Sequence, residues 1–185
     1  MINKWNFQTP SEEELHKRDQ LVAELGFSPV ICLLLVQRGI TSIEEAKKFF
    51  KPSLNDLHDP FLMPDMDKAV RRLNKALGNK EKILIYGDYD VDGTTAVSLV
   101  FKYLRPYSST LDFYIPDRYD EGYGISYKGI DYAAENGVSL VISLDCGIKA
   151  IEKIEYAKEK GIDFIICDHH MPDATLPDAV AVLDA

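Results

Sequence analysis

The stretch KILIYGDYDVDGTTA, residues 82–96, joins a short apolar run to three aspartates on alternate positions. The run KILIY has the length and the β-branched composition of a buried strand. Asp88, Asp90 and Asp92 lie too close together in sequence to be free anions without mutual repulsion. The stretch therefore predicts a strand that ends at a site for a positive charge.

Outward from this stretch, apolar runs alternate with helical segments from residue 80 to the end of the chain. Near-continuous apolar strands that alternate with helices are typical of a parallel sheet covered on both faces. The predicted fold is α/β, with a parallel, Rossmann-like sheet and a preceding helical region over residues 1–79. The expected strands cover residues 82–86, 111–115, 139–144, 163–167 and 179–184, and expected helices begin near residue 94 and after Ser126.

Residues 1–79 show helix signals rather than strand signals. SEEE at 11–14 and SIEE at 42–45 each fit a capping box. A further helix is expected over about residues 65–77, and its basic side chains share one face at helical spacing. That face is either solvated or a nucleic-acid contact. The basic residues are Lys68, Arg71, Arg72 and Lys75.

The charge of the chain is unevenly placed. The 185 residues carry a formal net charge of −9, and all of it comes from residues 79–185. This balance argues against a basic nucleic-acid footprint, although bound divalent cations would change the local sum. Three widely spaced cysteines suggest neither a disulfide framework nor a thiolate zinc site. With no signal-peptide pattern and no apolar run long enough to span a membrane, a cytoplasmic location is expected.

Acidic or imidazole side chains follow three of the predicted strands. GDYDVDG follows the first strand, DCG follows the third and DHH follows the fourth. Because ligands of open parallel sheets bind beyond the carboxyl ends of the strands, these segments predict one metal or catalytic site. Asp and His without thiolates suit Mg²⁺ or Mn²⁺. Asp90 and Asp92 could each lean toward one of two neighbouring ions, with Asp145 bridging them.

Two other motif matches fit the first segment less well. Residues 88–93 match the start of an EF-hand loop, but its twelfth position, where a bidentate Glu is needed, is Leu99. DVDGT at 90–94 also resembles the first motif of haloacid-dehalogenase-like phosphatases. In those enzymes the first Asp comes directly off the strand, whereas three residues intervene here.

Taken together, GDYDVDG at 87–93, LDCG at 144–147 and DHH at 168–170 resemble the DHH phosphoesterase superfamily. Within it they are most similar to the RecJ family of single-strand-specific exonucleases. YIPDRYDEGYGIS at 114–126 and LLLVQRGITSIEEAKKFF at 33–50 also look like RecJ segments. The resemblance covers nearly the whole chain and implies a DHH phosphoesterase domain over residues 80–185.

The resemblance also implies roles for single residues. His170 would face the scissile phosphate. Asp88 and Asp168 would orient ligands or carry protons, and either could also be a direct metal ligand. Arg118 would contact a phosphate of the DNA, with a salt bridge to Asp117, Asp120 or Glu121 as the alternative. The implied metal ligands are Asp90, Asp92, Asp145 and His169.

The implied function is a Mn²⁺- or Mg²⁺-dependent exonuclease that degrades single-stranded DNA 5′→3′ in repair and recombination, with two ions in the complete protein. RecJ-like proteins are expected to carry a further metal-binding Asp, a second phosphoesterase domain and an OB-type module. The chain would then be a C-terminally truncated fragment with reduced activity. The alternatives are a phosphodiesterase acting on short oligonucleotides or cyclic dinucleotides, and a non-catalytic partner-binding relative. The intact set of expected ligands speaks against the last.

Overall fold

Five parallel strands form one sheet, in the order β2-β1-β3-β4-β5. The predicted α/β fold is confirmed, and every expected strand is present within two residues of its expected bounds. The order changes direction between β1 and β3, because the chain first adds β2 on one side of β1 and then adds the later strands on the other. The strands are β1 (Lys82–Gly87), β2 (Leu111–Tyr114), β3 (Val138–Leu144), β4 (Asp163–Asp168) and β5 (Ala181–Asp184).

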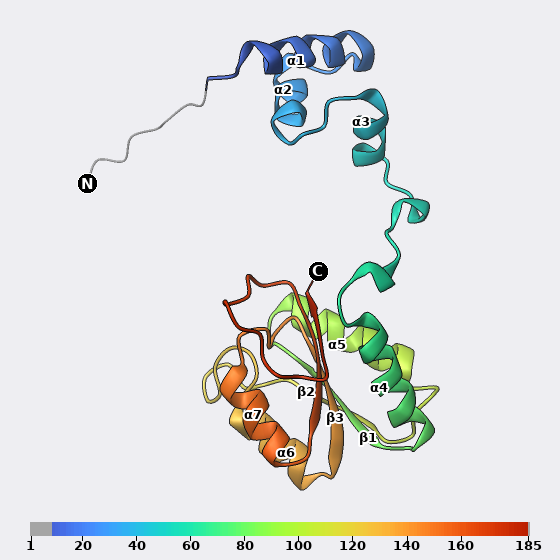
Figure 1. Ribbon diagram of the computed structural model, residues 1–185, viewed down its shortest axis with the longest axis vertical. Helices are drawn as coiled ribbons and strands as arrows, with labels where there is room; N and C mark the ends of the chain where they lie inside the picture. Colours follow the sequence, from blue (N-terminus) through green and yellow to red (C-terminus); the bar gives the residue numbers. More distant parts are fainter. Residues whose placement is uncertain (1–8, 185) are drawn as a thin grey trace, which may run out of the picture. The chain divides into compact units, whose positions relative to one another are not determined.

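Helices cover both faces of this sheet (Figure 1). The alternation of side chains along β1 shows the two layers. Ile83 and Ile85 pack with buried residues of α4 and α5, while Leu84 and Tyr86 pack with buried residues of α6 and α7. The helices are α4 (Met66–Gly78), α5 (Val91–Leu104), α6 (Tyr127–Glu135) and α7 (Ile151–Glu159).

The helix after β1 starts earlier than expected. It was predicted from about residue 94, but α5 begins at Val91 because Asp90 is its N-cap. The Asp90 carboxylate accepts the backbone N–H groups of Asp92 and Gly93, each at 3.0 Å. An aspartate that caps a helix satisfies donors that the first turn leaves without partners. Only Asp88, Tyr89 and Asp90 therefore lie between β1 and α5.

The structure describes residues 9–184, and within them the chain divides into two compact units between His58 and Asp59. The sequence suggested a boundary at residue 79 instead. The two boundaries differ because of α4, whose Ala69 and Ala76 are buried against the sheet. Arg72 of α4 also pairs with Glu81 at 2.7 Å and with Asp163 at 2.6 Å, so α4 belongs to the sheet unit.

The first unit is helical, as expected, although residues 1–8 of the predicted region lie outside the described residues. Both predicted capping boxes are confirmed, at Ser11 with Glu14 and at Ser42 with Glu45. The helices are α1 (Glu12–Leu25), α2 (Pro29–Gln37), α3 (Ile43–Phe50) and the short 3₁₀ turn η1 (Leu54–Asp56), and a second 3₁₀ turn, η2 (Pro60–Leu62), opens the sheet unit.

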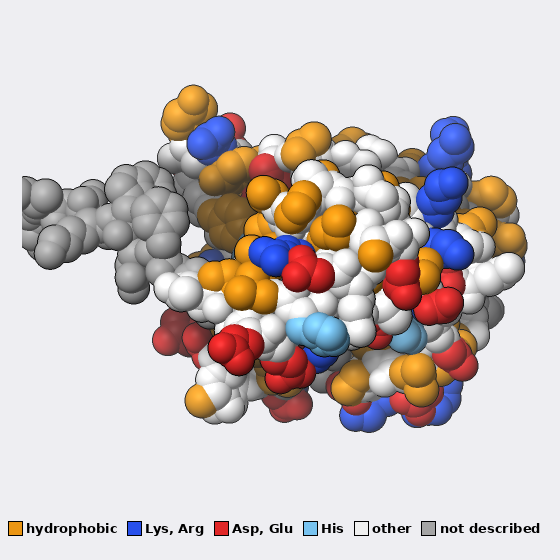
Figure 2. All heavy atoms as spheres, turned by 90° about the horizontal axis from the view of Figure 1, so that it is seen from above, with side chains coloured by type: hydrophobic (Ala, Val, Ile, Leu, Met, Phe, Trp, Pro, Cys, Tyr) orange, Lys and Arg blue, Asp and Glu red, His pale blue; other side chains and the backbone are white. Residues whose placement is uncertain are grey.

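Among the described residues, none of the helices has both the length and the apolar character needed to cross a membrane. Lys and Arg side chains are scattered among acidic and hydrophobic ones on the face shown in Figure 2. On the predicted basic face of α4, Lys68 and Arg71 pair with Asp65 and Asp67 of the same segment.

Candidate metal centre

Three strands of the sheet end in acidic or imidazole side chains at one edge. Asp88 follows β1, Asp145 follows β3, and Asp168 ends β4 with His169 directly after it. β1 and β3 are the neighbouring strands at which the strand order changes direction. In open α/β sheets ligands bind at this point, beyond the carboxyl ends of the strands. The structure thus brings the three sequence segments to the expected edge.

Asp145, His169 and His170 form the most compact group of candidate ligands. One ligand atom of each lies within 4.8 Å of the others, and His169 Nε2 is 3.0 Å from Asp145 Oδ1. Asp145 has a left-handed φ of 60°, which costs energy in a residue other than glycine and is often found at functional sites. Its N–H donates to the Cys167 carbonyl of β4 at 2.9 Å, which holds this conformation.

The surroundings of Asp145 favour an added positive charge. Burial raises the pKa of its carboxyl group, the negative charge of Asp90 raises it further, and His169 offsets only part of the shift. Because a nearby cation would reverse this effect, the carboxylate suits a bound metal ion. Asp92 lines a cavity of about 520 Å³ together with Asp145 and His169. Asp92 thus lies at the same cavity, although it is not part of the group whose ligand atoms lie within 4.8 Å of one another.

Asp88 and Asp90 have different local partners. Asp88 is fully buried, and its Oδ1 accepts the N–H of Gly124 at 3.2 Å. Its Oδ2 is also buried, and no donor within residues 9–184 reaches it. A buried carboxylate oxygen without a partner is costly and calls for an explanation, and a cation or an ordered water at this edge would supply one. Asp90 uses Oδ1 to cap α5, so a metal ligand at this residue would be its other oxygen.

The close approach of α5 to β1 explains why glycine stands at position 93. A Cβ added to Gly93 would lie 2.4 Å from the carbonyl oxygen of Asp88, far inside van der Waals contact. The missing side chain therefore lets the first turn of α5 lie directly against the end of β1. This contact brings Asp90 and Asp92 next to Asp88.

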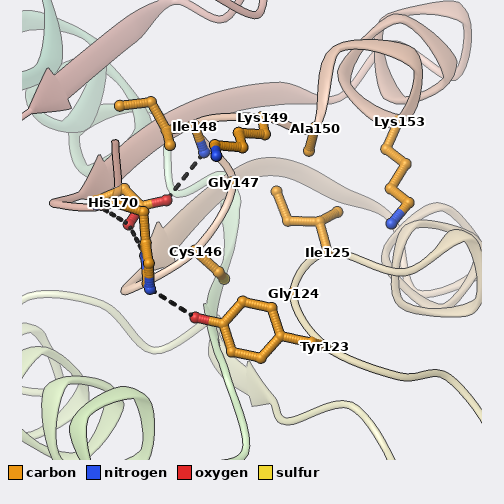
Figure 3. A pocket seen from close by; sticks show the side chains of 11 residues that line it. Tyr123, Gly124, Ile125, Cys146, Gly147, Ile148, Lys149, Ala150, Lys153 and His170 are labelled. Atoms are coloured by element: carbon orange, nitrogen blue, oxygen red, sulfur yellow. Dashed lines mark hydrogen bonds and ion pairs between the residues drawn. The ribbon is translucent and has the colours of Figure 1, made fainter. Parts of the chain in front are cut away.

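Asp168 and His170 form a hydrogen-bonded pair, and Figure 3 shows the ring of His170 directed toward the hydroxyl of Tyr123. The Nδ1 atom of His170 lies 2.7 Å from Asp168 Oδ1, and its Nε2 lies 3.1 Å from the hydroxyl of Tyr123. Burial acts to raise the pKa of Asp168, but the Ile148 N–H and the His170 ring outweigh it and lower the pKa. The same hydrogen bond to Asp168 raises the pKa of His170.

Arg118 has no carboxylate partner among the described residues. Of the three predicted salt-bridge partners, Asp120 pairs with Lys128, and Glu121 accepts hydrogen bonds from Tyr114. The guanidinium of Arg118 instead lies over the ring of Tyr89, 5.2 Å from its centre. The alternative salt bridge is thus absent from residues 9–184, and the cation remains available to a ligand.

The donors at this edge fit a hard or borderline divalent ion. They are carboxylate oxygens and imidazole nitrogens, which suit Mg²⁺ and Mn²⁺. A bound cation would satisfy the unpartnered oxygen of Asp88 and would offset the raised pKa of Asp145. Two residues that contribute to the site were not predicted from the sequence. Glu121 and the hydroxyl of Tyr123 act through tertiary contacts that residue types alone do not reveal.

These features define a class: a parallel α/β domain with a candidate divalent-metal centre at the switch point of its sheet. A comparison with protein families narrows the class. Residues 82–185, more than half of the chain, match the family described as "DHH family, N-terminal domain". The chain belongs to the DHH family.

Curated relatives and solved structures agree with this assignment. The chain is 41% identical over 180 residues to the single-stranded-DNA-specific exonuclease RecJ of Bacillus subtilis, and the match covers 97% of this chain and 22% of that protein. It is 34% identical to the protein of the same name from Haemophilus influenzae, over 84% of this chain and 27% of that one. A crystal structure of exonuclease RecJ bound to manganese matches with a TM-score of 0.62 and 28% identity, covering 68% of this chain and 32% of that one. The chain thus spans about a quarter of the length of these curated relatives.

Proposed function

We propose that this chain is the metal-binding catalytic domain of an exonuclease that hydrolyses phosphodiester bonds of single-stranded DNA 5′→3′, in DNA repair and recombination in the cytoplasm. The observation that carries the proposal is the group formed by Asp145, His169 and His170, at the edge of the sheet where the aspartates after β1 also lie. The names of the relatives give the substrate class, single-stranded DNA.

The side chains at this edge divide by position into ligands for ions and groups that face the substrate. The proposed ligands lie around the cavity and the helix start described above, and two ions are expected in the complete protein. Bound Mn²⁺ or Mg²⁺ would stabilise the negative charge that develops on the attacking and leaving oxygens. The proposed ligands are Asp90, Asp92, Asp145 and His169.

Two residues of this chain, His170 and Arg118, are proposed to face the substrate. His170 keeps its Nδ1 on Asp168 and turns Nε2 toward the loop that carries Tyr123. From there, Nε2 would face an oxygen of the scissile phosphate or of the leaving group, and it would donate to that oxygen when the ring is protonated. Asp88 would orient the aspartates after β1 from its buried position. Arg118 offers a planar guanidinium, which suits a phosphate of the DNA backbone or of a 5′ end.

We expect low or no activity from residues 1–185 alone. Family resemblance implies a further metal-binding Asp, a second domain and a DNA-binding module, and the match covers only 22% of the Bacillus subtilis relative. The net charge of −9 agrees with a DNA-binding surface located outside these residues.

The test is a cleavage assay with protein in excess over DNA, because slow turnover is expected. A long 3′-labelled single strand, its duplex and a dinucleotide are each incubated with and without Mn²⁺. The account predicts Mn²⁺-dependent shortening of the single strand only, lost in Asp145→Asn and kept in the exposed control Glu159→Gln. Preferential cleavage of the dinucleotide would indicate the small-substrate phosphodiesterase instead. Cleavage by Asp145→Asn at the parent rate would refute the proposal.

A further inference from the structure

We propose that Tyr123 is a positioning residue for His170. The loop over residues 115–126 is already ordered without substrate and holds the tyrosine in place. The inference rests on the proposed function, since it concerns the group that faces the scissile phosphate. It adds a residue outside the set of acids and histidines, together with the network that supports it.

The hydrogen bonds of Asp168 determine which ring nitrogen of His170 carries a proton. Asp168 Oδ1 accepts the backbone N–H groups of His169 and His170, at 2.8 and 3.2 Å, and Oδ2 accepts that of Ile148 at 3.0 Å. A carboxylate in these surroundings acts as an acceptor. The short contact to His170 Nδ1 is therefore an Nδ1–H donor bond, which leaves Nε2 of the neutral ring as an acceptor.

Tyr123 supplies the matching donor on the opposite side of the ring. Its hydroxyl lies 3.1 Å from Nε2, and the two ring planes meet nearly at right angles with centres 5.9 Å apart. With Asp168 on one nitrogen and Tyr123 on the other, rotation or flipping of the imidazole would break a hydrogen bond. Catalytic groups need to be held within about half an ångström of their productive position. The Tyr123 hydroxyl would provide this restraint at the nitrogen nearest the substrate.

The backbone next to Tyr123 is fixed to the end of β1. The Gly124 N–H donates to the buried Asp88 carboxylate at 3.2 Å, and its carbonyl accepts the hydroxyl of Tyr86 at 3.0 Å. That hydroxyl also accepts the Ser126 N–H at 3.0 Å. Gly124 has a φ of 81°, a left-handed conformation that glycine adopts without strain. Tyr123 is thus tied to the same strand end as the candidate metal centre.

The carboxylate of Glu121 accepts hydrogen bonds from several other parts of the loop. It accepts the hydroxyl of Tyr114 at 2.9 and 3.0 Å, the N–H of Asp117 at 2.8 Å and the hydroxyl of Ser126. Burial, and then the hydrogen bond to Glu121, raise the pKa of Tyr114 to about 12, so the phenol keeps its proton at neutral pH. One carboxylate therefore joins β2, the start of the loop and the N-cap of α6. Such a network orders the loop before any substrate arrives.

The first test is nuclear magnetic resonance of the metal-free chain at one fixed pH above the pKa of His170, so that the ring is neutral, with Tyr123→Phe and the control Tyr119→Phe. Tyr119 lies in the same loop, is 95% exposed and also loses only a hydroxyl. We expect the side-chain ¹⁵N spectrum of the parent to show Nδ1–H with a hydrogen-bonded Nε2 at His170. In Tyr123→Phe the Nε2 resonance should move toward the position of a free acceptor, with no movement in Tyr119→Phe. An unchanged His170 spectrum in Tyr123→Phe would overturn the inference.

The second test is the cleavage assay with the same variants and His170→Ala. Tyr123→Phe should lower kcat by roughly tenfold with little change in KM, because a misplaced proton-transfer group loses part of its usual contribution. Parent-like kcat in Tyr123→Phe, beside an inactive His170→Ala, would reject the inference and leave the proposed function standing. If the parent itself cleaves nothing, which the low or absent activity expected of residues 1–185 alone allows, the ¹⁵N shift still decides whether Tyr123 restrains His170.

Discussion

At the scale of single residues, Gly93 decides how closely α5 approaches β1. A methyl group at this position would meet the Asp88 backbone at 2.4 Å, and overpacking of this kind usually costs about 1–3 kcal/mol. Gly93→Ala should lower the free energy of unfolding by roughly 2 kcal/mol and should weaken Mn²⁺ binding, since Asp90 and Asp92 would move with the helix. Urea unfolding and calorimetric titration measure both effects.

Gly78→Ala is the matched control for this substitution. Gly78 is also in a helix, but a Cβ there would meet no atom within 4 Å. We expect its stability to stay within about 1 kcal/mol of the parent value. If Gly93→Ala behaved like this control and bound Mn²⁺ normally, the close approach would have no part in forming the site.

Asp90 and Tyr123 show which contacts of single residues the sequence alone does not reveal. Asp90 was predicted as a metal ligand, but its role as the N-cap of α5 was missed, because an aspartate after a strand fits a ligand and a cap equally well. Tyr123 was not among the site residues predicted from the sequence. Its hydrogen bond to His170 joins residues 47 positions apart in the chain, and no local pattern encodes that contact.

At the scale of elements, Arg72 connects α4 to the sheet. It pairs with Glu81 before β1 and with Asp163 at the start of β4, and only 10% of its side chain is exposed. Removing one partner of a buried ion pair leaves the others without compensation. Arg72→Met should therefore cost roughly 2 kcal/mol of stability, whereas Arg71→Met, which breaks an exposed pair with Asp67, should cost less than about 1 kcal/mol. Equal losses in the two variants would contradict this assignment.

The same ion pair predicts a pH dependence. Burial acts to raise the pKa of Glu81, but hydrogen bonds from Arg72, Ser139 and Asn79 outweigh it and lower the pKa. A carboxyl group whose pKa is lower in the folded state adds stability above its unfolded pKa of about 4.3, and this stability is lost as the pH falls through the lowered value. The stability of Arg72→Met should consequently fall less steeply with acid than that of the parent. Parallel curves from pH 7 to about pH 3 would contradict this prediction.

The loop from β2 to α6 depends on the Glu121 carboxylate. Glu121→Gln keeps the shape of the side chain and removes its charge, so the hydroxyls of Tyr114 and Ser126 face a weaker acceptor. We expect a smaller shift of the His170 Nε2 resonance than in Tyr123→Phe, in the same direction. The control is Glu135→Gln at the exposed end of α6, which should leave His170 unchanged. A parent-like His170 in Glu121→Gln would mean that the loop is ordered without this carboxylate.

The elements themselves could be predicted well where the apolar pattern is regular. All five strands were found because a parallel sheet buried on both faces requires runs such as SLVISL, which occupies most of β3. The boundary between the two units was misplaced for a physical reason. The amphipathic pattern of α4 shows that it packs against something, but its partners Glu81 and Asp163 become apparent only once the sheet is assembled.

At the scale of the whole molecule, every candidate ligand lies in the unit that begins at Asp59. The core of this unit is formed by its own strands and helices. Residues 59–185 should therefore fold alone and bind Mn²⁺ with an affinity within about threefold of the full chain, a difference below 1 kcal/mol. Calorimetric titration of both chains checks this. A much weaker affinity in the shorter chain would show that residues 1–58 contribute to the site.

We propose above that residues at the ends of three strands bind metal ions in one centre. The most direct test is a Mn²⁺ titration of this chain beside Asp145→Asn, His169→Ala and the exposed control His58→Ala. The account predicts that both site variants lose more than about tenfold in affinity, the loss expected even for partners that only support a ligand, while His58→Ala binds like the parent. If both site variants bound Mn²⁺ normally, the ion would belong to the aspartates after β1 alone. The proposed exonuclease centre would then lose its structural basis.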